Sequence, residues 1–167
     1  CKKSYAITVC RIEPENNVHK ILEAFALLED YQIVVVGNWK SGKYGLTLKE
    51  QYSKYVNIHL LDAIYDNHEI NWLRSNAALY IHGHSAGGTN PSLVEAMNLG
   101  LPILAFDCVY NRGTTFNKCL YWKKSQDIIL LITNRSSDFN NIANAMKSIG
   151  SQEYTWKTIA KKYAELY

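Results

Sequence analysis

The amino-acid sequence predicts an α/β protein built on a doubly wound parallel sheet. Short apolar runs rich in β-branched residues recur along the chain, and most of them do not alternate between apolar and polar positions. Such runs are typical of strands that are buried on both faces, as they are in a parallel sheet. Segments with helical periodicity separate these runs almost throughout, and this alternation indicates the doubly wound arrangement.

Six apolar runs are the predicted strands: Tyr5–Cys10, Gln32–Val36, Val56–Leu61, Ala77–Ile81, Pro102–Phe106 and Asp127–Ile132. Six helices are predicted beside them: Val18–Glu29, Leu46–Tyr55, Asn67–Ser75, Pro91–Leu99, Phe139–Ile149 and Tyr154–Tyr167. The first helix gathers its apolar residues on one face, namely Ile21, Leu22, Phe25 and Leu28.

The size and composition fit one domain that spans residues 1–167. Of the 167 residues, 47% are hydrophobic and 20% are charged, which is enough for a single core. The formal net charge of +3 is too small to indicate a nucleic-acid partner. No apolar run approaches the roughly 20 residues that span a bilayer, and no signal peptide is recognisable.

The four cysteines (Cys1, Cys10, Cys108 and Cys119) form no C-x-x-C pair and no cluster with zinc spacing. We therefore expect reduced thiols in a cytoplasmic protein, with Cys10 buried in a strand. The chain begins with Cys rather than Met and soon enters a strand, so we expect a piece of a longer polypeptide. The sequence predicts no metal site, because the histidines have no third ligand near them.

Ligands of an open α/β sheet bind outside the carboxyl ends of the strands, here in the loops after Cys10, Leu61 and Ile81. The third loop contains G-x-Ser85-x-G, the pattern of a serine-hydrolase nucleophile. Hydrolases of that type need a histidine later in the chain, and none follows Ser85. Pro91 would also lie in the second turn of the required helix, so the hydrolase interpretation is rejected.

The same loop instead predicts a cradle for a phosphate or diphosphate. Two glycines let a ligand approach the backbone, and a helix that starts at an Asn-Pro cap presents its N–H groups to an anion. The residues expected to form the cradle are Gly87, Gly88, Thr89, Asn90, Ser92 and Leu93. The alternative is a glycine-rich turn that only tightens strand-to-helix packing.

Glu95 lies one turn into this helix, on the same side as Ser92. A carboxylate there can accept hydrogen bonds from a ribose diol beside the diphosphate. The alternative is a solvated helix carboxylate, which is the commoner fate of a glutamate.

Three segments together resemble the C-terminal, donor-binding half of GT-B glycosyltransferases of family 4, the group 1 family. "RIEPENNVHKILEAFALL" is similar to the family's "GR…P-E-K-G…LL-A" segment, and "YIHGHSAGGTNPSLVEAMNLGLPILAF" is similar to its "P-S…E-x-F-G…EAMA-G-P-VIA" signature. "YTWKTIAKKYAELY" resembles its final helix. The resemblance covers nearly the whole chain. It implies a Rossmann-like sheet and retaining transfer of a sugar from a nucleotide donor to an acceptor hydroxyl.

The resemblance assigns site residues one by one. Glu95 matches the second Glu of the E-x7-E motif, which implies a contact to the donor ribose. Gly87 stands at the first Glu, so the family's usual contact to the donor sugar is missing. Arg11 matches the phosphate-binding Arg, but Asn16 replaces its Lys partner. Arg11 and the amides of the cradle are then expected to carry most of the diphosphate charge.

The segments "CRIEPENN", "HSAGGTNPSLVEAM" and "FDCVYNRGTT" resemble bacterial rhamnosyltransferases of this family. This implies dTDP-rhamnose as donor, no cofactor or required metal, and a role in cell-surface polysaccharide synthesis. Tyr65 lies in the loop that receives the base in this family; it either stacks on the base or caps a helix. Asp107 and Asn111 either touch the sugar or form a turn. Arg112 and Lys118 are two further basic residues, which either contact the phosphates or are solvated at the surface.

Two functions from different classes remain. The first is the donor-binding half of a hexosyltransferase, which acts with a missing N-terminal GT-B domain on a saccharide or lipid-linked acceptor. Its parent enzyme is expected in the cytoplasm or at the inner face of the plasma membrane. No catalytic residue is assigned, and this fragment alone is expected to be inactive. The second is a non-catalytic nucleotide-sugar binding or regulatory module.

Overall fold

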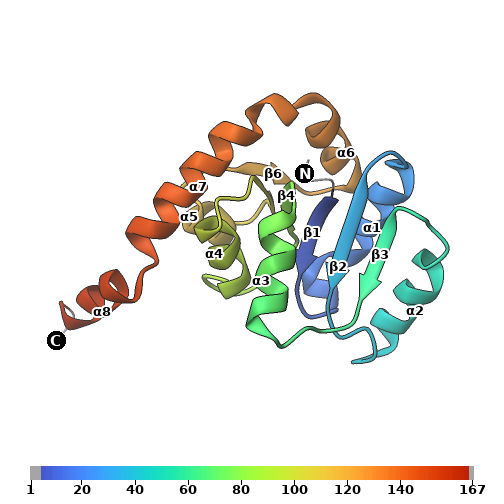
Figure 1. Cartoon of the computed structure of the whole chain (residues 1–167), viewed down its shortest axis with the longest axis horizontal. Helices are drawn as coiled ribbons and strands as arrows, with labels where there is room; N and C mark the ends of the chain where they lie inside the picture. Colours follow the sequence, from blue (N-terminus) through green and yellow to red (C-terminus); the bar gives the residue numbers. More distant parts are fainter. Residues whose placement is uncertain (1–4, 166–167) are drawn as a thin grey trace.

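The computed structural model describes residues 5–165 and contains a six-stranded parallel sheet with helices on both faces (Figure 1). The strands are β1 (Tyr5–Val9), β2 (Gln32–Val36), β3 (Ile58–Leu61), β4 (Leu79–His82), β5 (Ile103–Phe106) and β6 (Leu120–Trp122). Their order in the sheet is β3-β2-β1-β4-β5-β6. The sheet grows first to one side of β1 and then to the other, which confirms the predicted doubly wound arrangement.

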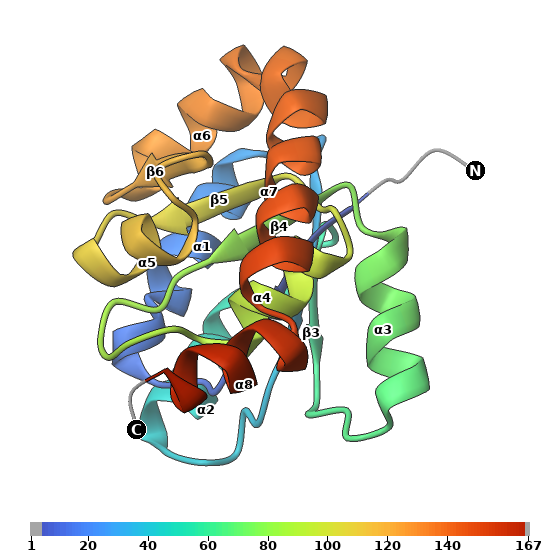
Figure 2. The ribbon, with the colours of Figure 1, turned by 90° about the vertical axis from the view of Figure 1, so that its left-hand side faces the viewer.

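The helices form two layers that enclose the sheet (Figures 1 and 2). One layer contains α1 (Val18–Leu27), α2 (Lys43–Tyr52) and α6 (Ser125–Asn134). The other contains α3 (Asn67–Asn76), α4 (Pro91–Asn98) and α7 (Phe139–Glu153). The remaining helices are α5 (Val109–Thr114), α8 (Trp156–Ala164) and the 3-10 turns Pro14–Asn16 and Ser136–Asp138. No helix between residues 5 and 165 is long and apolar enough to cross a membrane.

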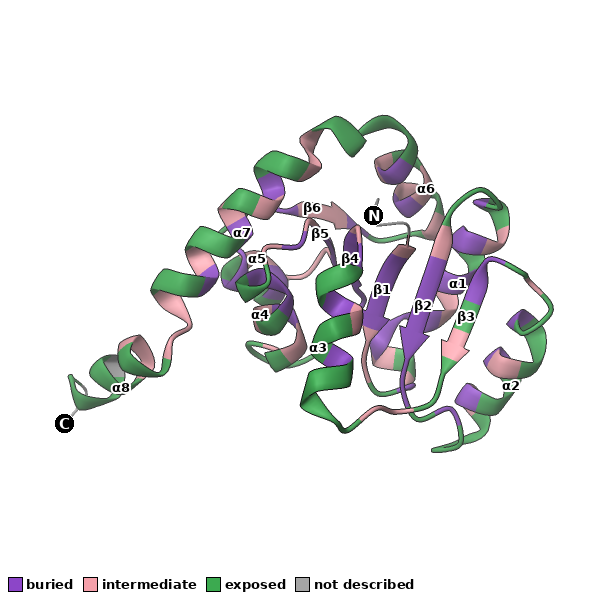
Figure 3. Ribbon diagram, in the orientation of Figure 1, coloured by how far each residue is buried: buried purple, intermediate pink, exposed green. Residues whose placement is uncertain are grey.

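Strand β2 is buried along nearly its whole length (Figure 3), and its residues contribute to the core on both faces of the sheet. Its Ile33 and Val35 join the cluster under α1, α2 and α6, whereas Val34 and Val36 join the cluster under α3, α4 and α7. All four are buried. Each such side chain contributes about 1.5–3 kcal/mol on burial, which accounts for the lack of alternation along the strand.

The prediction of a strand at Asp127–Ile132 is wrong, because this segment lies in helix α6. The Asp127 carboxylate accepts hydrogen bonds at 2.9 Å from the backbone N–H groups of Lys123 and Lys124, which caps the start of the helix. Ile128 and Ile132 are both buried, one helical turn apart. The sixth strand is β6 instead, only three residues long.

The C-terminal helices also differ from the prediction. Helix α7 continues to Glu153, beyond the predicted end at Ile149. The predicted helix Tyr154–Tyr167 lies partly outside the described residues, and its described part is α8, which extends away from the sheet (Figure 1). The short helix α5 was not predicted, since its six residues show no apolar periodicity.

Candidate functional site

The loops that follow β1 and β4 meet at the carboxyl end of the sheet, where the strand order reverses. Between them lies a cavity of about 150 Å³. Its lining residues are Val9, Cys10, Arg11, Asn16, His82, His84, Asn90 and Ser92. The reversal of strand order is the place where open α/β sheets bind their ligands, so this cavity is the candidate site.

Contacts between the two loops fix the shape of the cavity. The Asn17 side-chain amide donates to the Gly83 carbonyl at 2.9 Å, and both the backbone N–H and the hydroxyl of Ser85 donate to the Glu15 carbonyl at 2.9 Å. A Cβ at Gly83 would lie 2.0 Å from the Asn16 carbonyl oxygen, so only glycine allows this approach. Ser85 therefore joins the two loops, which agrees with the rejection of a nucleophilic role.

The N-terminus of α4 is capped as the sequence predicts, and the cap changes which N–H groups are free. The Asn90 side-chain oxygen accepts from the Ser92 N–H at 3.0 Å, and the Asn90 carbonyl accepts from the Leu93 N–H at 3.1 Å. The expectation that these two N–H groups are free is therefore wrong. In the described part of the chain, the N–H groups of residues 87–90 have no hydrogen-bond partner. Gly87 holds a φ of +81°, which favours glycine. The N–H groups without a partner are therefore those of this loop and not those of the first turn of α4.

Arg11 lines the cavity and is loosely held by two acidic neighbours. Its Nε lies 3.5 Å from a Glu13 carboxylate oxygen, and its Nη2 lies 3.8 Å from a Glu15 carboxylate oxygen. The Arg11 side chain is 74% exposed. Ion pairs this exposed are worth at most about 1 kcal/mol, so the guanidinium is free to exchange a carboxylate for an anionic ligand.

Glu95 is held by a residue that the sequence did not single out. Its Oε2 lies 2.7 Å from Nη2 of Arg74, whose side chain is only 5% exposed, whereas that of Glu95 is 50% exposed. Glu95 lines a neighbouring cavity of about 370 Å³, which it shares with Thr89, Pro91, Val94, Tyr154, Trp156 and Ile159. The Glu95 carboxylate is therefore neither unpaired nor simply solvated, because one of its oxygens pairs with a buried arginine.

The remaining candidate site residues are either exposed or hydrogen-bonded to other parts of the protein. Tyr65 is 87% exposed in the loop after β3. Asp107 accepts from Arg112 Nε at 2.5 Å, and the guanidinium lowers the pKa of this carboxyl group. Asn111 is buried and donates to the carbonyls of His84 and Phe106, both at 2.8 Å. These bonds give Asn111 a structural role, whereas Lys118 takes no part in the cavity.

Two histidines at the end of β4 have different surroundings. His82 is buried, and its Nε2 has no hydrogen-bond partner among residues 5–165. Burial, with a smaller effect of the nearby His84, lowers the pKa of His82 to about 3, so His82 is neutral near pH 7. His84 is half-buried, and its Nδ1 lies 2.9 Å from the Asn16 side-chain oxygen. Within the described residues, no group of three or more His, Cys, Asp or Glu is arranged to hold a metal ion.

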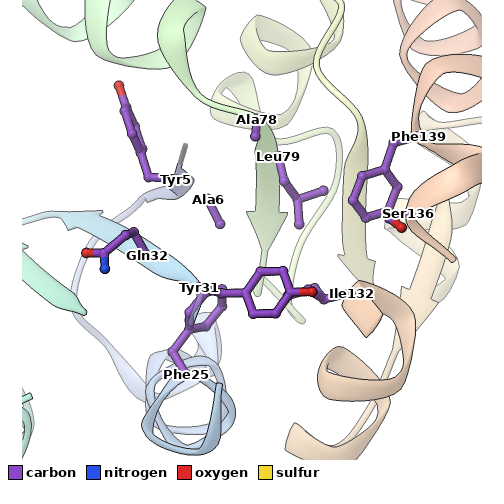
Figure 4. Close-up of a pocket in the computed structure, with 10 residues that line it drawn as sticks. All are labelled: Tyr5, Ala6, Phe25, Tyr31, Gln32, Ala78, Leu79, Ile132, Ser136 and Phe139. Atoms are coloured by element: carbon purple, nitrogen blue, oxygen red, sulfur yellow. The ribbon is translucent and has the colours of Figure 1, made fainter. Parts of the chain in front are cut away.

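A further cavity, of about 260 Å³, lies at the opposite, amino end of the sheet (Figure 4). Its lining contains no charged side chain, and the Tyr5 hydroxyl already donates to the Leu73 carbonyl at 2.7 Å. The residues around it are Tyr5, Ala6, Phe25, Tyr31, Gln32, Ala78, Leu79, Ile132, Ser136 and Phe139. It offers no set of converging polar groups, so it is not the candidate site for an anionic ligand.

A sequence comparison identifies the family. The family profile described as "Glycosyl transferases group 1" matches residues 2–118, which include both loops of the cavity. The chain belongs to this family. A search of curated proteins found no match.

Several solved structures have a fold similar to that of this chain. Anabaena Alr3699/HepE, crystallised with UDP, superposes with a TM-score of 0.82 at 19% identity, over 98% of this chain and 48% of HepE. The sucrose-phosphate synthase of Thermosynechococcus elongatus gives a TM-score of 0.81 at 15% identity, over 100% of this chain and 45% of the synthase. This chain therefore spans about half the length of these proteins, and its sheet is the Rossmann-like half of a GT-B fold.

A similar domain has also been crystallised by itself. It is the C-terminal domain of the group 1 protein LpcC from Francisella tularensis, with a TM-score of 0.71 at 18% identity. The match covers 91% of this chain and 87% of that domain.

Proposed function

We propose that this chain is the donor-binding half of a retaining family 4 glycosyltransferase. The observation that carries the proposal is the cavity at the strand reversal, which Arg11 lines together with Asn90 and Ser92 at the start of α4, next to the loop whose N–H groups at residues 87–90 have no described partner. Positive charge and unpaired amides at a helix N-terminus are the features that bind phosphate groups. HepE was crystallised with UDP, which supports a nucleoside diphosphate as the ligand of this fold.

In the proposed reaction, the nucleoside diphosphate leaves with growing negative charge as its bond to the sugar breaks. Arg11 and the loop amides stabilise that charge, which lowers the barrier to departure. We propose that the site requires no metal ion. Glu95 accepts from the pentose of the donor, and Tyr65 stacks on the base.

The finer parts of the proposal concern the donor and the acceptor. We propose dTDP-rhamnose as the donor, since Gly87 offers no side chain to a sugar and a 6-deoxy sugar needs fewer polar contacts. Arg74 leaves Glu95 one carboxylate oxygen without a described partner, which suits a deoxyribose with its single 3′-hydroxyl. The acceptor is a saccharide or a lipid-linked saccharide of a cell-surface polysaccharide, bound with the N-terminal half of a cytoplasmic or peripheral membrane enzyme.

A non-catalytic nucleotide-sugar binding module is the second candidate, and Gly87 favours it. The family's acid at this position is absent, so the donor sugar loses its usual contact. Joining this chain to the N-terminal half of its parent protein distinguishes the two functions, because only a transferase gains turnover. The chain alone is expected to show negligible transfer.

Titration calorimetry of the chain with dTDP, UDP and GDP tests the proposal. We expect dTDP to bind most tightly, and Arg11→Gln to weaken the binding about tenfold, the usual loss for one charge-assisted contact. The matched control is Arg135→Gln, which removes an exposed, carboxylate-paired arginine outside the cavity and is expected to change nothing. Absence of binding by the unaltered chain, or equal losses in both variants, would contradict the proposal.

A further inference from the structure

Arg11 and the two acidic side chains beside it carry no net positive charge. Arg11 stands between Glu13 and Glu15 at 3.5 and 3.8 Å, and the position of the family's second basic residue is occupied by Asn16, which is neutral. A nucleoside diphosphate brings two or three negative charges. A further cationic group in the same cavity would therefore improve the charge balance with the ligand.

The hydrogen bonds of Asn16 fix the orientation of the His84 ring. The Asn16 Nδ2 donates to the Arg11 carbonyl at 2.9 Å, so its Oδ1 is the atom that faces His84. Because an amide oxygen carries no hydrogen, the His84 Nδ1 must carry the proton of their 2.9 Å bond. In the neutral ring the other nitrogen, Nε2, then carries no hydrogen.

The His84 Nε2 faces the phosphate cradle. A Cβ built on Gly87 would lie 3.8 Å from this nitrogen, and His84 lines the same cavity as Arg11, Asn90 and Ser92. The absence of a side chain at Gly87 keeps an acid away from the ring. An imidazolium here can therefore donate to an incoming phosphate rather than to a neighbouring carboxylate.

We propose that His84 is the second cationic group of the diphosphate site. A proton from solvent binds Nε2 as the nucleoside diphosphate enters, and the new N–H donates to a phosphate oxygen. Asn16 is the positioning residue that holds the ring. This inference rests on the proposed nucleotide-binding function and adds to it a residue and a pH dependence.

The other titratable groups near His84 do not explain a proton that is taken up when the ligand binds. From β4, the His82 ring lies 6.3 Å away, and burial keeps it neutral. Burial also raises the pKa of the Cys10 thiol to about 12, with Glu13 adding to the shift. Arg11 pairs with Glu13 and Glu15, and from the loop after β5 the Cys108 thiol lies 3.9 Å from the His84 carbonyl.

Proton uptake on binding is the measurement that tests the proposal. Calorimetric titrations with UDP, dTDP and pyrophosphate at pH 7.5, in two buffers of different ionisation enthalpy, give the number of protons taken up per ligand. We expect His84→Gln to lower this number and to weaken binding about tenfold at pH 6.5, but less at pH 8.5. The ligand's own ionisation cancels in the comparison of variant with wild type.

Two further variants sharpen the test. Asn16→Asp places a carboxylate beside Nδ1, which stabilises the imidazolium of His84 before the ligand arrives. Because the ring then already carries its second proton, we expect this variant to take up fewer protons on binding than wild type. His59→Gln is the matched control, because His59 pairs with Gln32 on β2 and does not line the cavity. Nitrogen NMR of the wild-type imidazole, with and without UDP, gives the same answer without any variant: Nε2 is expected to gain a hydrogen.

The outcomes separate this inference from the proposed function. If wild type binds nucleotide but His84→Gln matches it in affinity and proton uptake, the role of His84 is overturned while nucleotide binding stands. An Nε2 that gains no hydrogen on addition of UDP overturns it as well. If wild type binds neither nucleotide nor pyrophosphate, the proposed function and the inference fail together.

Discussion

Arg11 and Arg74 both form ion pairs with glutamates, and the two arginines differ in burial. Arg11 is 74% exposed and lies 3.5 to 3.8 Å from its two acids, whereas Arg74 is 5% exposed and lies 2.7 Å from Glu95. Water surrounds the first pair, so its carboxylates can be exchanged for a ligand at little cost. The second cannot be broken without leaving a charge in the protein interior. One pair is therefore suited to binding and the other to holding a carboxylate in place.

The largest expected effect comes from breaking the buried pair. Glu95→Ala leaves the Arg74 guanidinium buried without a partner, and we expect a loss of about 3 kcal/mol in the free energy of unfolding. Adding Arg74→Met should restore much of that loss, because a buried apolar side chain needs no partner. Urea denaturation of the single and double variants measures the coupling. Strictly additive effects would show that the pair does not act as a unit.

His82 differs from both arginines, because it is a buried basic side chain with no acidic partner among the described residues. The lowered pKa of His82, about 3 against an ordinary value of 6.5, means that the unfolded chain binds a proton more readily than the folded one. Stability is therefore lost as pH falls from about 6.5 toward 3, by about 2 kcal/mol between pH 7 and 5. His82→Phe should remove this part of the pH dependence. Parallel stability curves for wild type and variant would contradict the neutral, buried state of His82.

The smallest effect on stability is expected from the exposed pair. Arg11→Gln should change the free energy of unfolding by less than about 0.5 kcal/mol, since exposed ion pairs contribute little. Thermal denaturation, run beside the binding assay, separates the two properties. A large loss of stability would mean that Arg11 is part of the scaffold and that the contrast between the pairs is false.

The sequence predicts those features of the site that depend on neighbouring residues. Asn90 and Pro91 mark the start of α4 because capping is a local interaction, and the apolar runs place five strands. The strand predicted at Asp127–Ile132 failed because a short apolar run fits a buried strand and a buried helix equally well. Its capping by Asp127 was the available signal that it begins a helix.

Contacts between segments that lie far apart in the chain could not be predicted from the sequence. Arg74 and Glu95 lie on different helices, and Arg74 in the last turn of α3 has the sequence context of an ordinary surface residue. The bond between Asn16 and His84 joins residues 68 positions apart. Its effect, an oriented imidazole, depends on the amide orientation that the Arg11 carbonyl imposes. Only the packed structure brings such partners together.

The reversal of strand order divides the sheet into two consecutive stretches of chain. Residues before the loop at 62–66 supply β1, β2 and β3, those after it supply β4, β5 and β6, and the strands of the two stretches pair only through β1 and β4. The cavity lies across that seam, with Arg11 and Asn16 on one side and His84 and Asn90 on the other. A chain cut in the 62–66 loop would thus form two fragments, each holding half of the site, and ligand binding would report their reassembly.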